Sequence, residues 1–144
     1  MKSINPAVKF FINLAKTQTI LTGRFDRGLG GLGFNEFLIL YNLGLAEGEK
    51  MRRIDIAGKI GLTASGVTRI LLPMEKVQLI KSGPVENDAR VRYVRLSGEG
   101  KEKLAEALER LDDLSEDIIP KHGLKEVDVF SKLLLEIGGK ALMS

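Results

Sequence analysis

The feature that most constrains this chain is a pair of short helical patterns separated by Gly61-Leu62-Thr63. Before the turn, apolar residues recur every three positions from Ile54 to Ile60, and Gly61 suits the left-handed end of a helix. After the turn, Thr63 is a favoured N-cap residue. The apolar residues of the second pattern recur at spacings of three and four: Val67, Ile70, Leu71 and Met74. Two helices joined so tightly must cross closely, so the pattern predicts a helix-turn-helix.

A β-hairpin is expected after the second helix. Residues 77–82 suit a short strand, and residues 91–96 alternate between apolar and polar side chains as a second strand does. The segment between them, residues 83–90, is too long for a two-residue turn, so it is expected to project as a loop, or wing. Pro84 in that loop discourages edge pairing. Pro73 is expected to kink the preceding helix or loosen its last turn, leaving the N-terminal half intact.

Amphipathic helices are expected on both sides of this winged helix-turn-helix. They cover residues 5–25, 34–46, 97–118 and 124–142, and a polar loop is expected at residues 47–51. Asn5, Gly33 and Ser97 stand at cap positions, with Glu36 three residues after Gly33. The fold class is therefore mainly α (α+β), with six helices and one hairpin. The expected division is a first dimerisation helix with a Gly-rich linker (1–33), the winged domain (34–96) and two further dimerisation helices (97–144).

The segment from Gly28 to Gly33 matches the dinucleotide-binding pattern G-x-G-x-x-G. That pattern needs a preceding strand and a βαβ unit, whereas an amphipathic helix precedes it here. We therefore interpret the glycines as a flexible connection between two helices.

Charge is distributed unevenly although the net charge is only +3. Residues 50–95 contain ten Lys and Arg against four Asp and Glu, while residues 97–144 contain seven against eleven. A basic centre beside an acidic segment is typical of a local nucleic-acid contact, although chance clustering of solvated charges gives the same pattern.

Several other functions are disfavoured by what the chain lacks. It contains no cysteine, which excludes disulfides, thiolate metal sites and thiol redox sensing. His122 is the single histidine, so no histidine-based zinc site or histidine–cysteine pair is expected. No apolar run approaches the length of a membrane span. We therefore expect a cytoplasmic protein that is not an enzyme and needs no metal or cofactor.

Residues 62–76, the Leu79-Ile80-Lys81 strand, Asp88-Ala89-Arg90 and Leu96-Ser97-Gly98-Glu99-Gly100 together resemble the MarR (multiple antibiotic resistance regulator) family. The resemblance covers nearly the whole chain. It implies a homodimeric transcription regulator, with repression as the expected effect, that binds a pseudo-palindromic operator in double-stranded DNA. The terminal helices would form the dimerisation domain. Many members of the family respond to small aromatic or phenolic effectors.

Physical chemistry assigns DNA-contacting roles to residues of the winged unit. Hydroxyl and guanidinium groups at the start of the second helix suit base edges and phosphates of the major groove, and the helix N-terminus suits a phosphate. An arginine on a wing suits a narrow minor groove, and a neighbouring carboxylate can orient it. The candidates are Thr63, Ser65, Gly66, Thr68 and Arg69 on the helix, Arg90 and Arg92 on the wing with Asp88 orienting them, and Arg52, Arg53 and Lys81 on the DNA backbone.

Two alternatives remain open from the sequence. A winged helix can serve as a protein-interaction module without binding DNA. A DNA reader can also be constitutive or gated by a ligand. A ligand pocket would lie near Phe11, Ala15, Phe37 and Tyr41, but apolar residues at helical spacing also suit a plain core.

Overall fold

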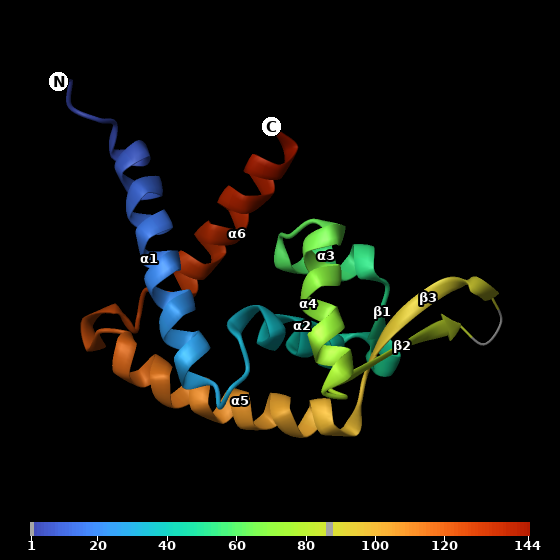
Figure 1. Ribbon diagram of the computed structural model, residues 1–144. Coiled ribbons are helices and arrows are strands. Elements are labelled where there is room, and N and C mark those ends of the chain that lie inside the picture. The colour runs from blue at the N-terminus through green and yellow to red at the C-terminus, as the bar shows by residue number, and fades with distance from the viewer. Residues whose placement is uncertain (1, 86–87) are drawn as a thin grey trace. The chain divides into compact units, whose positions relative to one another are not determined.

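The computed structural model describes residues 2–85 and 88–144, with residues 85 and 88–91 described by their backbone. Within them lie six α-helices, two short 3-10 turns and three strands (Figure 1). The elements are α1 (Pro6–Gly28), α2 (Phe34–Leu45), η1 (Glu47–Glu49), β1 (Lys50–Met51), α3 (Arg53–Ile60), α4 (Ala64–Lys76), β2 (Ile80–Val85), β3 (Asp88–Leu96), α5 (Gly98–Ile118), η2 (Lys121–Gly123) and α6 (Val127–Met143). The predicted fold class is confirmed.

The chain forms two compact units, Met1–Leu111 and Asp112–Ser144, and α5 contributes to both. The first unit contains α1 to α4, the sheet and the greater part of α5. The second contains the end of α5, η2 and α6. The three-part division at residues 33 and 96 stays a prediction.

Local capping explains where the helices begin. The Asn5 side chain accepts a hydrogen bond from the Ala7 amide at 2.8 Å, and the Glu36 carboxylate accepts one from the Gly33 amide at 2.8 Å. Both caps were predicted. The helix α1 continues to Gly28, three residues beyond its predicted end, and α6 begins at Val127 because the preceding residues turn.

The Gly-rich segment connects α1 to α2, as predicted, and it forms a packed corner. Leu29 and Leu32 are 0% and 2% exposed, and they anchor the segment in the core. Gly30 has a φ of +68°, which a glycine adopts without strain, and its carbonyl accepts a hydrogen bond from Lys103 Nζ on α5 at 2.6 Å. The glycines therefore allow a tight turn in which the side chains of Leu29 and Leu32 are buried.

The core of the first unit lies among α2, α3, α4 and the sheet. Its fully buried side chains come from every one of these elements: Ile39, Leu40, Leu43, Ile56, Val67, Leu71, Met74, Ile80 and Val94. Ile54, which helped to predict α3, is 60% exposed, and Ile56 is buried in its place. Pro73 does not end α4, which continues to Lys76.

The three strands form an antiparallel sheet in the order β1-β3-β2. The predicted hairpin is confirmed, but its long loop is wrong, because β2 reaches Val85 and β3 begins at Asp88. Pro84 lies within β2 opposite Arg92, just before an irregularity in the register. This position is tolerated because β2 is an edge strand. β1 was missed, since residues 47–51 were expected to form a polar loop.

A single hydroxyl joins three segments of the first unit. Ser97 Oγ lies 2.7 Å from the Gln78 carbonyl oxygen and 2.8 Å from that of Leu79, and it accepts a hydrogen bond from the Gly100 amide at 2.9 Å. Gly100 is buried, and a Cβ there would overlap the Leu79 carbonyl oxygen. The end of α4, the exit from β3 and the start of α5 are therefore held together.

Replacing Ser97 with Ala should lower the free energy of unfolding by about 1–3 kcal/mol, because α5 loses its cap and part-buried carbonyls lose a donor. Urea denaturation followed by circular dichroism measures the change. Ser115→Ala, at an exposed position of α5, is the control and should stay within about 0.5 kcal/mol of the parent. Equal stability of both variants would refute the structural role of Ser97.

Candidate nucleic-acid interface

The helix-turn-helix is built from α3, a left-handed glycine and α4. Gly61 has a φ of +75°, and its amide donates to the Ala57 carbonyl at 2.9 Å, which closes α3. Ala57 is 3% exposed and Val67 is 0% exposed. The predicted close crossing of the two helices is therefore confirmed, and it fixes the direction in which α4 leaves the turn.

The start of α4 is capped by Thr63. Its Oγ1 accepts a hydrogen bond from the Gly66 amide at 3.1 Å and lies 3.3 Å from Ser65 Oγ. The Gly66 amide is thus satisfied within the helix. A phosphate at this helix end would be bound by the amides of Ala64 and Ser65, together with the two hydroxyls.

The N-terminal half of α4 has one buried and one exposed face. Val67 and Leu71 are buried, whereas Ser65 and Arg69 are exposed. Thr68 is half-buried, and its hydroxyl donates to the Ala64 carbonyl at 3.1 Å, so it keeps accepting capacity but no free proton. The structure therefore places the predicted major-groove residues on one accessible stretch of helix.

The two arginines before α3 differ in their surroundings. Arg52 Nε lies 3.0 Å from Asp55 Oδ2, and this hydrogen bond and the carboxylate charge raise the pKa of Arg52 above its ordinary value. Arg53 is exposed. The Arg52 guanidinium is therefore already paired with Asp55, whereas Arg53 is paired with no carboxylate of the described residues.

The hairpin carries the predicted cations of the wing. Arg92 and Lys81 are exposed on β3 and β2. Asp88 and Arg90 lie on the backbone of β3, but their side chains fall outside the described residues, so their roles stay predictions.

Two cations of the sheet were missed as candidates. Lys50 pairs with Arg95 across β1 and β3, and Lys81 pairs with Arg95 across β2 and β3. The two residues of β1 are too short a pattern to be recognised as a strand. The sequence therefore could not predict that Lys50 pairs with Arg95 of the hairpin.

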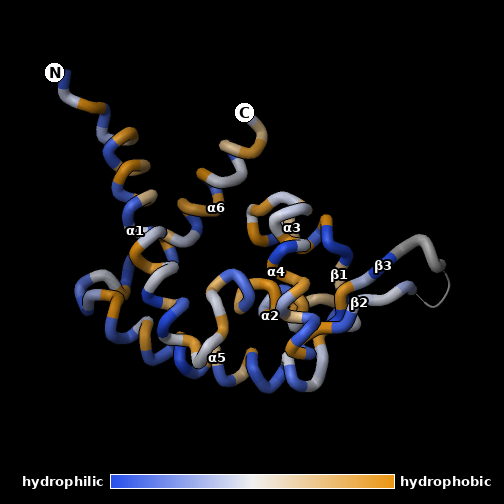
Figure 2. Tube along the Cα trace, viewed as in Figure 1, coloured by the Kyte–Doolittle hydropathy of each residue, from blue (hydrophilic) through white to orange (hydrophobic). Residues whose placement is uncertain are grey.

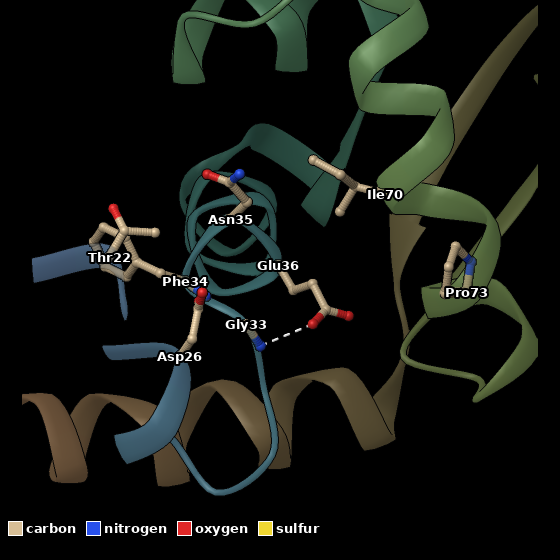
Figure 3. A pocket seen from close by; sticks show the side chains of 8 residues that line it. All are labelled: Thr22, Asp26, Gly33, Phe34, Asn35, Glu36, Ile70 and Pro73. Atoms are coloured by element: carbon tan, nitrogen blue, oxygen red, sulfur yellow. Dashed lines mark hydrogen bonds between the residues drawn. The ribbon is translucent and has the colours of Figure 1, made fainter. Parts of the chain in front are cut away.

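A groove of about 380 Å³ lies in the first unit between α1, α2 and α4 (Figure 3). Its wall combines apolar side chains with hydroxyl, amide and carboxylate groups: Thr22, Asp26, Gly33, Phe34, Asn35, Glu36, Ile70 and Pro73. Asp26 Oδ1 accepts from the Phe34 amide at 2.7 Å, and Glu36 accepts from the Gly33 amide. Among the described residues, no lysine, arginine or histidine lines this groove.

The four residues predicted for a ligand pocket do not line this groove. Phe37 is buried and its ring lies 6.0 Å from that of Tyr41, which is 40% exposed. Phe11 is 50% exposed and Ala15 is exposed on α1. The structure therefore brings Phe37 and Tyr41 together. The groove is lined by their neighbour Phe34 and not by either of them.

Solved structures share this arrangement over nearly the whole chain. A MarR family transcriptional regulator from Streptomyces coelicolor, solved in complex with DNA, is 19% identical with a TM-score of 0.74, and the alignment covers 94% of this chain and 91% of that one. The PcaV transcriptional regulator from the same organism, solved with its natural ligand, is 15% identical with a TM-score of 0.83, covering 98% and 99%.

A third similar structure is an organohalide-sensing transcriptional regulator in its 2,4-dichlorophenol-bound form. It is 20% identical with a TM-score of 0.85, covering 97% of this chain and 83% of that one. The fold is that of the MarR-type regulators. No protein-family model and no curated protein matches the chain at the level of sequence.

We also searched the described residues for groups that could bind a metal ion and for helices that could span a membrane. None of their His, Asp and Glu side chains gather in groups of three or more that could hold a metal ion. None of their helices combines the length and the apolar character needed to cross a bilayer.

Replacing Thr63 with Ala should destabilise the chain by about 1 kcal/mol, because the Gly66 amide loses its cap. Thr68→Ala, on the same helix, is the control, since it removes only a hydrogen bond to a carbonyl that the helix ladder already uses. It should change stability by less than about 0.5 kcal/mol. Thermal unfolding of both variants measures the difference, and a larger loss of stability for Thr68→Ala would contradict the assigned cap.

Proposed function

We propose that this chain is a homodimeric transcriptional regulator of MarR type that binds pseudo-palindromic double-stranded DNA and acts as a repressor. The observation that carries the proposal is the two-sided N-terminal half of α4. Its apolar face is buried in the core, while Ser65 and Arg69 are exposed beside a capped helix end. The similar structure in complex with DNA supports the same use of the fold.

In the proposed complex, α4 enters the major groove and reads base pairs there. Arg69 donates two hydrogen bonds to a guanine or a phosphate, Ser65 meets base edges or phosphates, and Thr68 accepts a hydrogen bond from a base edge. Because these three side chains lie within one and a half turns of the helix, they would contact neighbouring base pairs of one half-site.

In the proposed complex, residues outside α4 add further affinity for DNA. Arg90 and Arg92 reach the minor groove from the hairpin, with Asp88 orienting them. The cations that bind the DNA backbone without sequence preference are Arg53, Lys81 and Arg52, the last of which shares its charge with Asp55.

A homodimer is proposed from the apolar surface of the end helices, each considered in its own unit. Phe10, Phe11 and Ile12 on α1 are 39%, 50% and 55% exposed. On α6, Phe130 and Leu134 are 56% and 44% exposed. Figure 2 shows apolar residues recurring along both helices. Apolar patches of this kind mark an interface in a water-soluble chain, and two copies would bring two α4 helices to two half-sites.

We further propose that a small ligand occupies the groove between α1, α2 and α4 and changes DNA affinity. The groove touches Ile70 and Pro73 of α4, so a molecule bound there contacts the DNA-reading helix directly. Its polar groups include the carboxylates of Asp26 and Glu36 and, among the described residues, no cation, which favours a neutral phenol over an aromatic carboxylate. The similar regulator in its 2,4-dichlorophenol-bound form supports a phenolic effector.

Replacing Arg69 with Ala should weaken operator binding by about 1–3 kcal/mol, and Arg69→Lys should recover only part of it because lysine cannot form the bidentate contact. Fluorescence anisotropy with labelled operator measures both. Arg24→Ala, at an exposed arginine of α1, is the control that removes the same charge. If the affinity of the parent chain for the operator did not fall with salt concentration, the result would instead favour a protein-interaction module.

Replacing Leu134 with Glu should convert the dimer to a monomer, because a carboxylate would be buried without a partner at the proposed interface. Sedimentation velocity measures the change in mass. Ser131→Glu adds the same charge on the same helix and should remain dimeric. A parent chain that is monomeric at micromolar concentration would contradict the proposed dimer.

Phenol and 2,4-dichlorophenol should raise the melting temperature, whereas benzoate should not. Stabilisation should reach about 2.7 kcal/mol at a ligand concentration 100 times the Kd. Asp26→Asn should reduce the shift by removing a charged acceptor. A ligand that stabilises the chain must also change operator affinity; binding without that change would leave a constitutive DNA reader.

A further inference from the structure

The outer face of the sheet carries three cations in a row. Lys50 of β1 stands opposite Arg95 of β3, and Arg95 stands opposite Lys81 of β2. Directly opposed residues of an antiparallel sheet share one face. The next residues along, Met51 and Val94, point the other way and are buried. The row Lys50–Arg95–Lys81 therefore lies on the face of the sheet away from the core, where Lys81 is exposed and Lys50 and Arg95 are half-buried.

Such a row is electrostatically unfavourable in the chain alone. The Cβ atoms of opposed residues are about 4.5–5.5 Å apart, and like charges on directly opposed residues are destabilising. In the described residues, no carboxylate lies within ion-pair distance of these three cations, and the nearby Glu49 is paired with Lys101 at 2.8 Å. A bound anion would offset the repulsion.

An aromatic ring lies beside the end of the row that Lys50 occupies. The Lys50 ammonium lies 5.2 Å from the centre of the Tyr93 ring, on the same face as Arg95.

Two carboxylates flank the row. Glu47 lies in the hollow shared with Lys50 and Tyr93, and Glu75 lies in the hollow beside Lys81. Among the described residues, neither carboxylate forms an ion pair with Lys50 or Lys81, so both cations can still bind an anion.

The dimensions of the row match a nucleic-acid strand. Neighbouring strands of a sheet are about 4.8 Å apart, so the row spans roughly 10 Å between its outer members. Successive phosphates of one DNA strand are separated by about 3.4 Å along the axis and also wind around it, so they lie farther apart in space than that rise and are comparable in spacing to the members of the row. Three flexible cations can therefore meet three successive phosphates.

We propose that Lys50, Arg95 and Lys81 bind the phosphodiester backbone of DNA outside the base pairs read by α4 and the hairpin. This inference rests on the proposed DNA-binding function and extends its footprint. The row contributes affinity that is independent of sequence, and each operator half-site is bound more tightly when double-stranded DNA continues beyond it. An operator cut to its half-sites lacks this contact.

The test compares two duplexes, one limited to the selected half-sites and one with about one extra helical turn of arbitrary sequence, about 10 base pairs, at each end. The full-length parent chain should bind the longer duplex roughly tenfold more tightly at 0.1 M salt. The variant Lys50→Gln/Lys81→Gln/Arg95→Gln should bind both duplexes alike. Its salt dependence on the longer duplex should fall by about one unit of slope for each phosphate that the row no longer neutralises.

Two further variants keep the result interpretable. Lys121→Gln/Lys125→Gln/Lys132→Gln removes the same charge from exposed positions of the second unit and should retain the preference for the longer duplex. Lys81→Gln alone, at the most exposed member of the row, should reduce that preference even if the triple variant is unstable.

The outcomes separate the two proposals. If the parent chain binds neither duplex in preference to unrelated DNA, the proposed function fails. If it binds the short duplex specifically but gains nothing from the added turns, or if the triple variant keeps the gain, the proposal for the sheet fails while the function stands.

Discussion

The Ser97 hydroxyl holds together the parts of the chain on which DNA reading would depend. It contacts the carbonyl groups that follow α4 and caps α5, immediately after β3 ends. Gly100 allows α5 to approach the Leu79 carbonyl more closely than any side chain would permit. Because Gln78 beside them has a positive φ of 65°, the connection from α4 to β2 is also constrained. The end of α4, the hairpin and the start of α5 are thus fixed as one body.

This constraint limits how a ligand can act. With the α4, β3 and α5 ends joined at Ser97, a ligand in the groove against Ile70 and Pro73 would move the winged unit as a whole. A ligand can change DNA affinity only if it binds two arrangements of the dimer with different affinities. In the proposed dimer, those arrangements would differ in the separation and orientation of the two α4 helices.

Most of the helical fold followed from local patterns. Caps at Asn5, Thr63 and Ser97, and the left-handed Gly61, act through residues only a few positions away, and the sequence therefore reveals them. β1 and the true length of the hairpin depend on pairing between distant residues, which periodicity does not report. The packing of the Gly-rich corner was not predicted for the same reason, since Leu29 and Leu32 are buried by tertiary contacts.

The candidate site was predictable to a similar extent. The exposure of Ser65 and Arg69 follows from helical spacing once the apolar positions are assigned to the core. The hydrogen bonds that occupy Thr68 and Arg52 depend on the folded geometry, because helix interiors and ends offer several competing partners. The carboxylate-lined groove also required the fold, since its walls come from three helices.

Selection of bound duplexes from a random library bears most directly on DNA recognition. A dimer that reads DNA through two α4 helices should enrich an inverted repeat whose half-sites are centred about 10 base pairs apart, or a multiple of that distance. The Arg69→Ala variant should lose the enrichment at the positions that Arg69 reads. Enrichment of a single, unrepeated half-site would contradict the dimer, and no enrichment at all would contradict DNA recognition by this fold.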